Sequence, residues 1–145
     1  MFNLKPIALV IGTVTCAIGF FLFIPLITEL VYQTETWQSY AVPILIYLIV
    51  GGSLVIINRN VDLKISLKEG FIITVVSWLL ITFLSAVPFI YTKVNLNIID
   101  ALFESMSGVT TTGATVLSNL NNLPKGILIW RAFLQWLGGI GIVVI

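Results

Sequence analysis

Three long apolar runs without a charged residue constrain this chain more than any other feature of its sequence. They cover residues 7–27, 41–57 and 71–92. A helix needs about 20 consecutive, mainly apolar residues to cross the hydrocarbon core of a bilayer. Apolar residues make up 59% of the chain and charged residues 9%, which is unusual for a soluble domain. The sequence therefore predicts an all-α membrane protein.

The first run has a competing interpretation as a secretory signal peptide. It is longer than the apolar core of such a peptide, which has about 7–15 residues, and no small-residue cleavage site follows it. We therefore interpret residues 7–27 as a membrane span, with a kink expected near Pro25. Glu29 and the polar residues 33–39 are assigned to the loop after this span.

The charged and reactive residues exclude several classes of protein. A formal net charge of +1 gives a nucleic-acid partner no electrostatic support. The chain has no histidine, and its single cysteine, Cys16, lies inside an apolar run, which excludes a disulfide framework and a cysteine-rich metal site. Because no paired carboxylates, histidine or reactive cysteine are available for catalysis, we do not expect an enzyme.

Residues 97–115, between the third run and the last apolar segment, are too polar to span a membrane. Asn97 is a good helix N-cap, and Asp100 three residues later gives a weak version of a capping box. Apolar residues then recur at helical spacing, and Gly108 is expected to end the helix. Such a helix would rise about 16 Å, which is roughly half of the hydrocarbon core.

Residues 110–115, here called the Thr/Gly segment, read Thr-Thr-Thr-Gly-Ala-Thr and favour an extended backbone over a helix. A half-length helix followed by such a segment is typical of a re-entrant pore loop. An extended segment can turn carbonyl oxygens toward a pore, where they replace the hydration shell of a cation. Gly113 would supply the backbone freedom for this arrangement, and the C-terminal end of the helix would favour a cation.

This region has two other interpretations. Residues 108–115 are a near miss to a phosphate-binding loop, because Ala114 stands where the lysine is needed and a helix precedes the glycines where a strand is needed. An ordinary polar loop between two spans fits the spacing as well, and spacing alone leaves it open.

The residues themselves indicate a family. Phe103-Glu-Ser-Met-Ser-Gly-Val-Thr-Thr-Thr-Gly-Ala-Thr115 closely resembles the first pore loop of the Trk-type potassium transporters, which are relatives of the Ktr-type membrane subunits. Residues 126–141 are similar to the helix that follows this loop there. The resemblance covers essentially the whole chain but only the first part of the family's full length, because such proteins carry four pore units in one polypeptide.

The resemblance implies how the chain is divided. Residues 1–68 would be two accessory transmembrane helices and a cytoplasmic loop, and residues 69–145 the first pore unit with the start of its second helix. The sequence ends at Ile145 within an apolar run, so we expect it to be truncated.

The resemblance also implies a function and partners. The function would be potassium uptake across the inner (plasma) membrane, with K⁺ as the transported ion and no covalently bound cofactor. Both channel-like flux and symport with protons or sodium remain open. The partners would be the lipid bilayer, the remaining pore units, a homodimer partner and a cytoplasmic nucleotide-binding regulatory subunit, with no nucleic acid.

The same resemblance assigns the ion-binding residues, because residues 111–115 align with the potassium-channel filter TVGYG. The backbone carbonyls of Thr111, Thr112 and Gly113 would bind K⁺, with Thr110 and Ala114 beside them. Alanine replaces the channel tyrosine, and threonine replaces the last glycine. We therefore expect fewer well-held sites and weaker potassium selectivity than in a channel.

Glu104 and Arg131 are charges in or near the membrane, where such residues are often functional. A structural ion pair between the short helix and the next span is the favoured interpretation, since a filter of carbonyls needs no side-chain charge. Residues 138, 139 and 141 are glycines that suit either a gating hinge or close helix packing, and we favour packing.

Two functions other than potassium uptake are also compatible with the sequence. A small homotetrameric potassium channel would also consist of a span, a pore loop and a span. A non-conducting membrane scaffold subunit would tolerate substitutions in the Thr/Gly segment.

The Lys and Arg distribution predicts that the N-terminus is cytoplasmic. Inner segments then hold Lys5, Arg59, Lys64 and Lys68, and outer segments hold Lys93, Lys125 and Arg131. This bias places the loop of residues 58–69 inside and the Thr/Gly segment on the outer side.

This orientation is testable by cysteine labelling in a Cys16→Ala background. A cysteine placed at Asp62 should react with a membrane-impermeant thiol reagent only after the membrane is permeabilised, because residues 58–69 are expected inside. Reaction of that cysteine in intact cells would contradict the orientation.

Overall fold

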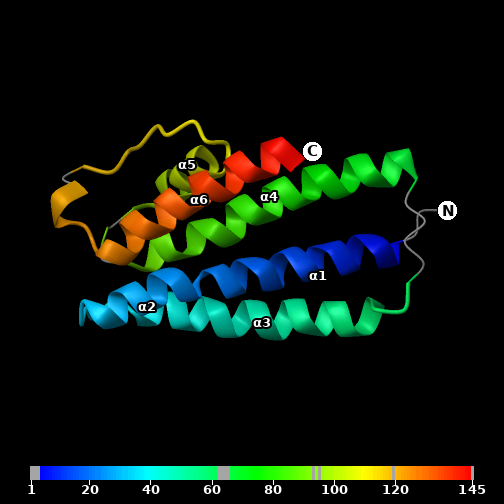
Figure 1. Ribbon diagram of the computed structural model, residues 1–145, viewed down its shortest axis with the longest axis horizontal. Coiled ribbons are helices and arrows are strands. Elements are labelled where there is room, and N and C mark those ends of the chain that lie inside the picture. The colour runs from blue at the N-terminus through cyan, green and yellow to red at the C-terminus, as the bar shows by residue number, and fades with distance from the viewer. Residues whose placement is uncertain (1–3, 62–65, 93, 95, 119, 145) are drawn as a thin grey trace.

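The computed structural model describes residues 4–61, 66–92, 94, 96–118 and 120–144 (Figure 1). Asp62, Lys64 and Lys93, which the orientation argument uses, lie outside the described residues. All regular structure within these ranges is helical, which confirms the predicted all-α class. The elements are α1 (Leu4–Phe21), α2 (Phe23–Val31), α3 (Gln38–Asn58), α4 (Leu67–Tyr91), α5 (Ile98–Val109), the 3₁₀ turn η1 (Leu120–Asn122) and α6 (Lys125–Val144).

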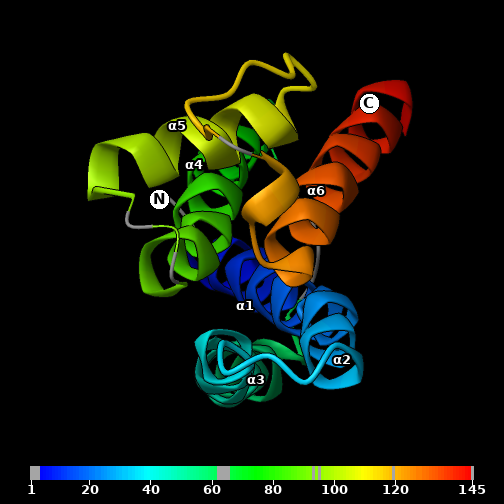
Figure 2. The ribbon, with the colours of Figure 1, turned by 90° about the vertical axis from the view of Figure 1, so that its left-hand side faces the viewer.

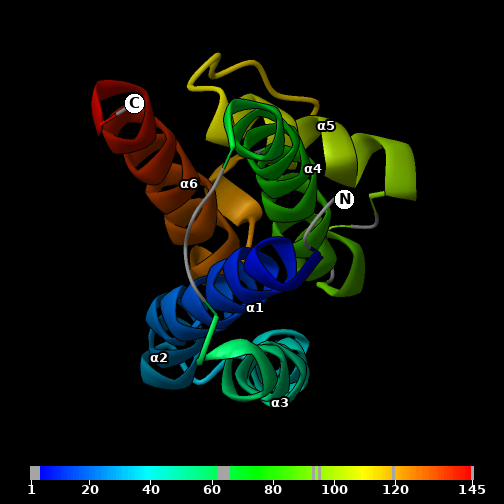
Figure 3. The ribbon, with the colours of Figure 1, turned by 90° about the vertical axis from the view of Figure 1, so that its right-hand side faces the viewer.

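The helices form a bundle around α1. Among the described residues, three helical stretches are long and apolar enough to cross a membrane, namely Leu4–Val31, Gln38–Asn58 and Leu67–Tyr91. Views along the bundle from its two ends place α1 between α3 on one side and α4 and α6 on the other (Figures 2 and 3). The short helix α5 packs on α4 and α6. α4 ends and α6 begins at the same end of the bundle (Figure 1).

A proline separates α1 from α2. Pro25 has no N–H, and its ring displaces the carbonyl four residues earlier, that of Phe21. The helix is interrupted at Leu22, although the Leu26 N–H still donates to the Leu22 carbonyl at 3.2 Å. Pro25 therefore coincides with an interruption of the first span, but the chain continues in nearly the same direction and no marked kink is seen (Figure 1).

A second proline creates an attachment point for a neighbouring helix. α4 continues through Pro88, which leaves the Leu84 carbonyl without its helical donor. The hydroxyl of Tyr47, on α3, donates to that carbonyl at 2.9 Å. The indole N–H of Trp130, on α6, donates to the next carbonyl, that of Ser85, at 3.0 Å. α3 and α6 are thus fixed to the same turn of α4.

The contact between α1 and α3 depends on small residues. A Cβ on Gly51 would lie 2.8 Å from the Cys16 backbone nitrogen and 2.8 Å from the Gly12 carbonyl oxygen. Both distances are shorter than packed atoms tolerate, so the two backbones approach each other only because residue 51 is glycine. A Cβ on the neighbouring Gly52 would meet no atom of the described residues within 4 Å.

This difference gives a matched pair of substitutions. Gly51→Ala should destabilise the protein by about 1–3 kcal/mol because it overpacks the α1–α3 contact. Gly52→Ala should be neutral or slightly stabilising, because alanine is the better helix former and the space is open. Thermal unfolding in detergent, followed by tryptophan fluorescence, measures both. Equal effects of the two variants would contradict the packing described.

Candidate functional site

The short helix α5 begins where the sequence predicts and ends differently. The side chain of Asn97 accepts the N–H of Asp100 at 2.8 Å and caps the helix. The prediction that Gly108 ends the helix is wrong, since α5 continues to Val109. Gly108 instead allows close packing on α6, because a Cβ there would lie 3.0 Å from the Cβ of Leu134.

The Thr/Gly segment has an irregular backbone and lies exposed. Thr111 has a φ of 60°, which is rare for a β-branched residue, and Gly113 has a φ of 76°. The Thr111 N–H donates to the Gly108 carbonyl at 3.0 Å, and the Gly113 N–H donates to the Ser107 carbonyl at 3.3 Å. The segment therefore turns over the end of α5 before it leads away, and it is not a regular strand.

A buried carboxylate joins α5 to the end of this segment. The side chain of Glu104 is 0% exposed. One of its oxygens accepts the Val116 N–H at 2.6 Å and also the hydroxyl of Thr115. The other oxygen lies 2.9 Å from Nε of Arg131, on α6. Burial of a carboxylate is costly unless it is paired and hydrogen-bonded, and Glu104 has both kinds of partner.

Arg131 extends this network to the carbonyls of the Thr/Gly segment. Its Nη2 donates to the carbonyl of Gly113 at 2.8 Å and to that of Ala114 at 3.2 Å. The hydroxyl of Ser107 donates to the Ala114 carbonyl as well, at 2.6 Å. The segment is therefore held at its C-terminal half by charged and hydroxyl donors from α5 and α6.

The sequence-predicted residues thus fall into two groups. Glu104 and Arg131 meet each other, and Arg131 binds the carbonyls of Gly113 and Ala114. In residues 110–112, by contrast, the side chains bond locally. The Thr110 hydroxyl donates to the Met106 carbonyl at 2.8 Å and lies 2.9 Å from the Thr112 hydroxyl. Within the described part of the chain, the carbonyl oxygens of Thr111 and Thr112 have no hydrogen-bond donor.

Gly138 of the glycine-rich end of α6 serves close packing. A Cβ on Gly138 would lie 1.9 Å from the carbonyl oxygen of Val109, the last residue of α5. A Cβ on Gly139 would be 3.9 Å from the Thr111 methyl carbon, which is an ordinary contact. α6 can therefore pass the C-terminal end of α5 only with glycine at position 138, which supports the packing interpretation there.

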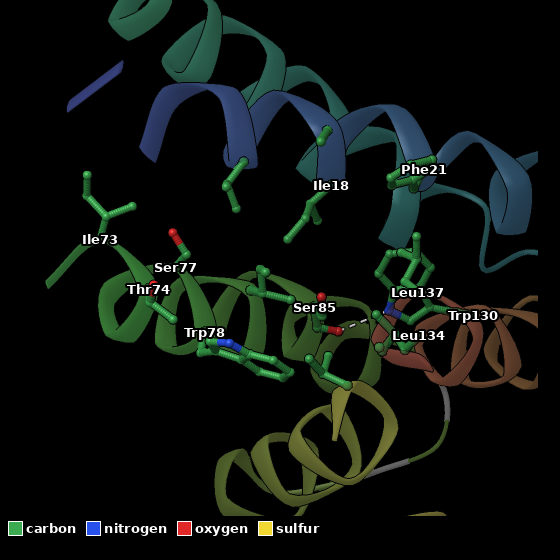
Figure 4. Close-up of a pocket in the computed structure, with 15 residues that line it drawn as sticks. Ile18, Phe21, Ile73, Thr74, Ser77, Trp78, Ser85, Trp130, Leu134 and Leu137 are labelled. Carbon is green, nitrogen blue, oxygen red and sulfur yellow. Dashed lines mark hydrogen bonds between the residues drawn. The ribbon is translucent and has the colours of Figure 1, made fainter. Parts of the chain in front are cut away.

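A separate cavity lies between α1, α4 and α6 and does not belong to this network. Its volume is about 380 Å³ and its lining is mostly apolar, with Ile18, Phe21, Trp78, Leu134 and Leu137 among the residues (Figure 4). The hydrogen bond between Trp130 and Ser85 lies at one end of it (Figure 4). Cations need oxygen ligands, so this cavity offers them little.

Sequence reasoning missed two residues that the structure brings together. Glu29 lies in α2 and not in a loop, and it is fully buried. It accepts the N–H of Gly126, 97 residues away, at 2.6 Å. No local pattern signals this contact, because it depends on how α2 and α6 pack. The one hint is Pro124, which precedes α6 and has no side-chain acceptor to cap it.

Comparison with known proteins identifies the family. The TrkH family model, described as "Cation transport protein", matches residues 37–145. The Trk system potassium uptake protein TrkH of Escherichia coli K12 is 36% identical over 144 residues, which cover 99% of this chain and 30% of that protein. An uncharacterized cation transporter of Methanocaldococcus jannaschii is 34% identical over 143 residues, with 99% and 30% covered.

A second Trk system protein of Escherichia coli K12 matches over a shorter stretch. TrkG of strain K12 is 35% identical over 122 residues, which cover 83% of this chain and 25% of that protein. The chain thus spans about 30% of the length of the first curated relatives that it matches. These matches confirm the resemblance seen in the sequence, and the chain belongs to the TrkH family of cation transport proteins.

Proposed function

We propose that this chain supplies one pore unit of a Trk-type potassium uptake protein. Residues 1–68 would be its accessory helices and residues 69–145 the pore unit, in which α5 is a re-entrant pore helix and the Thr/Gly segment a filter. The family and the names of the relatives support potassium as the transported ion. α4 ends and α6 begins at the same end of the bundle, which supports a re-entrant course for the residues between them (Figure 1).

The main support for the proposal is that the Thr/Gly segment is held by hydrogen bonds at only some of its carbonyls. Arg131 and Ser107 occupy the carbonyls of Gly113 and Ala114, whereas those of Thr111 and Thr112 have no donor in the described residues. A filter needs this arrangement, because its carbonyls must be held by the protein and yet be free to replace water around an ion.

The backbone geometry further supports this assignment. In a regular strand, successive carbonyls point to opposite sides. Positive φ values at Thr111 and Gly113 break that alternation. We therefore assign the carbonyls of Thr111 and Thr112 as principal ion ligands. The Gly113 carbonyl has a second lone pair beyond its bond to Arg131, and Thr110 and Ala114 flank the site.

The surroundings of the site follow from the same proposal. Non-helical backbone is stable at membrane depth only when protein or a water-filled cavity covers it, so the exposed Thr/Gly segment needs further pore units around it. We place the protein in the inner membrane with a cytoplasmic N-terminus. On the family resemblance alone, we propose a homodimer partner and a cytoplasmic nucleotide-binding regulatory subunit.

The first test replaces Gly113 in the full-length protein. Gly113→Ser puts a Cβ on a backbone with φ 76°, and the nearest atom, Nε2 of Gln135, would be an ordinary 3.7 Å away. The effect is therefore backbone strain rather than crowding. Half-saturation of uptake should shift to potassium concentrations higher by on the order of tenfold, with poorer discrimination against sodium.

The measurement is potassium and sodium flux into liposomes that contain the purified protein. Gly52→Ser is the control, because its Cβ would point into open space. Unchanged affinity and ion preference in Gly113→Ser would remove Gly113 from the filter.

The second test concerns the Glu104–Arg131 pair. Arg131→Gln leaves a buried carboxylate without its counter-charge and should cost about 3–5 kcal/mol of stability. Glu104→Gln combined with Arg131→Gln should be less destabilised than Arg131→Gln alone, because no charge stays buried. Lys125→Gln, an exposed cation on the same helix, is the control. A double variant that is at least as destabilised as Arg131→Gln in thermal unfolding would contradict the coupling.

A further inference from the structure

Glu29 is a buried acid whose partners are all uncharged. It is 0% exposed and lies near the end of α2. One carboxylate oxygen accepts the backbone N–H of Gly126 at 2.6 Å. The other accepts the hydroxyls of Thr34 and Thr36, in the turn after α2. Within the described residues Glu29 makes no ion pair, so something other than a cationic side chain must stabilise its charge.

The N-terminus of α6 supplies that stabilisation. The first N–H groups of a helix have no partner within the helix, and together they carry partial positive charge. α6 starts at Lys125, directly after Pro124, which has no side-chain acceptor. Gly126 lies in this first turn. Glu29 therefore acts as the N-terminal cap of a helix that is distant in sequence.

The shape of the contact supports the same role independently. A Cβ on Gly126 would lie 2.5 Å from Oε1 of Glu29 and 2.9 Å from the hydroxyl oxygen of Tyr40. Both distances are too short, so only glycine lets the carboxylate reach this N–H. The hydroxyl of Tyr40 is buried in the same place and has no hydrogen-bond partner among the residues that the structure describes.

α6 connects this contact to the Thr/Gly segment. Arg131 lies about 1.4 turns, or roughly 7.5 Å, further along the helix. A shift or rotation of the first turn of α6 would therefore move the guanidinium group that binds the carbonyls of Gly113 and Ala114. Fraying of the uncapped first turn would have the same consequence.

We propose that Glu29 is a positioning residue that fixes α6, and through Arg131 the carbonyls of the Thr/Gly segment, from the accessory helix α2. Its effect on ion selection rests on the proposed function, whereas its effect on the structure does not. Glu29 lies outside residues 37–145, which the family model matches. The proposal gives the accessory helices a role in the site itself, beyond covering the bundle.

The structural test is hydrogen exchange of the full-length protein in lipid nanodiscs. In Glu29→Ala, the amides of the first turn of α6 should exchange about fivefold faster or more, as expected for loss of a helix cap. The amides of Gly113 and Val116 should exchange faster too. Gly126→Ala should accelerate exchange of the same amides, because its methyl group would push the Glu29 carboxylate away from the Gly126 N–H.

Two control variants distinguish loss of the cap from a general loss of folding. Glu29→Gln keeps an oxygen for the Gly126 N–H and an amide that can donate to the threonine hydroxyls, so it should restore most of the protection. Tyr40→Phe removes a hydroxyl without a partner at the same place and should leave exchange unchanged. Exchange in the first turn of α6 that is unchanged in Glu29→Ala would overturn the cap.

The functional test compares variants of similar stability. Glu29→Ala should raise the half-saturating potassium concentration about two- to fivefold and lower potassium-over-sodium preference, since it transmits no more than the free energy of a cap. Gly51→Ala destabilises the accessory α1–α3 contact without touching α6, and it should leave both quantities unchanged. Equal shifts in the two variants, or faster exchange in α6 with Gly113 and Val116 still protected, would overturn the positioning role.

The filter proposal is tested by a different variant, Gly113→Ser. If Gly113→Ser leaves potassium affinity and ion preference unchanged, the Thr/Gly segment is not a filter. The exchange of Gly113 and Val116 in Glu29→Ala then still decides whether Glu29 positions the segment.

Discussion

A backbone group that loses its helical partner inside a membrane has no water to replace it, and three contacts between segments of this chain satisfy backbone groups of this kind. Tyr47 donates to the carbonyl that Pro88 leaves without a donor. Arg131 donates to carbonyls of the Thr/Gly segment, and Glu29 accepts an N–H from the start of α6. At these three places, a backbone group without a helical partner is therefore also a point where a neighbouring helix or segment is fixed.

Among the described residues, Glu29 and Glu104 are fully buried carboxylates, and they are stabilised by different partners. Glu104 has a cationic partner, Arg131, and Glu29 has a helix N-terminus. Both also bind backbone N–H groups, so their charges are compensated and their positions are tightly defined. Both act on α6, Glu29 at its first turn and Glu104 through Arg131. α6 is thus fixed by the accessory helix α2 through Glu29 and by α5 through Glu104. Its Arg131 in turn binds the Thr/Gly segment.

Local features of the chain were predictable, and contacts between distant segments were not. The Asn97 cap of α5 was correctly predicted because the donor and acceptor are three residues apart. Gly108 was wrongly assigned as the end of α5, because a glycine near a helix end can serve a cap or a close contact, and here the contact is with Leu134. Gly51 and Gly52 are adjacent in sequence, and only packing distinguishes the one against α1 from the one facing open space.

By itself, the sequence determined the helical class, the apolar spans and the family, because each depends on composition, spacing or a contiguous motif. It also supplied the residues of the candidate site. Tertiary structure alone decided which carbonyls of the Thr/Gly segment are bound by Arg131 and which have no donor in the described residues, and that Glu29 caps α6. The physical reason is that a buried charge or an unpaired backbone group takes whichever partner the helix packing brings within hydrogen-bond reach, and that partner can be 97 residues away.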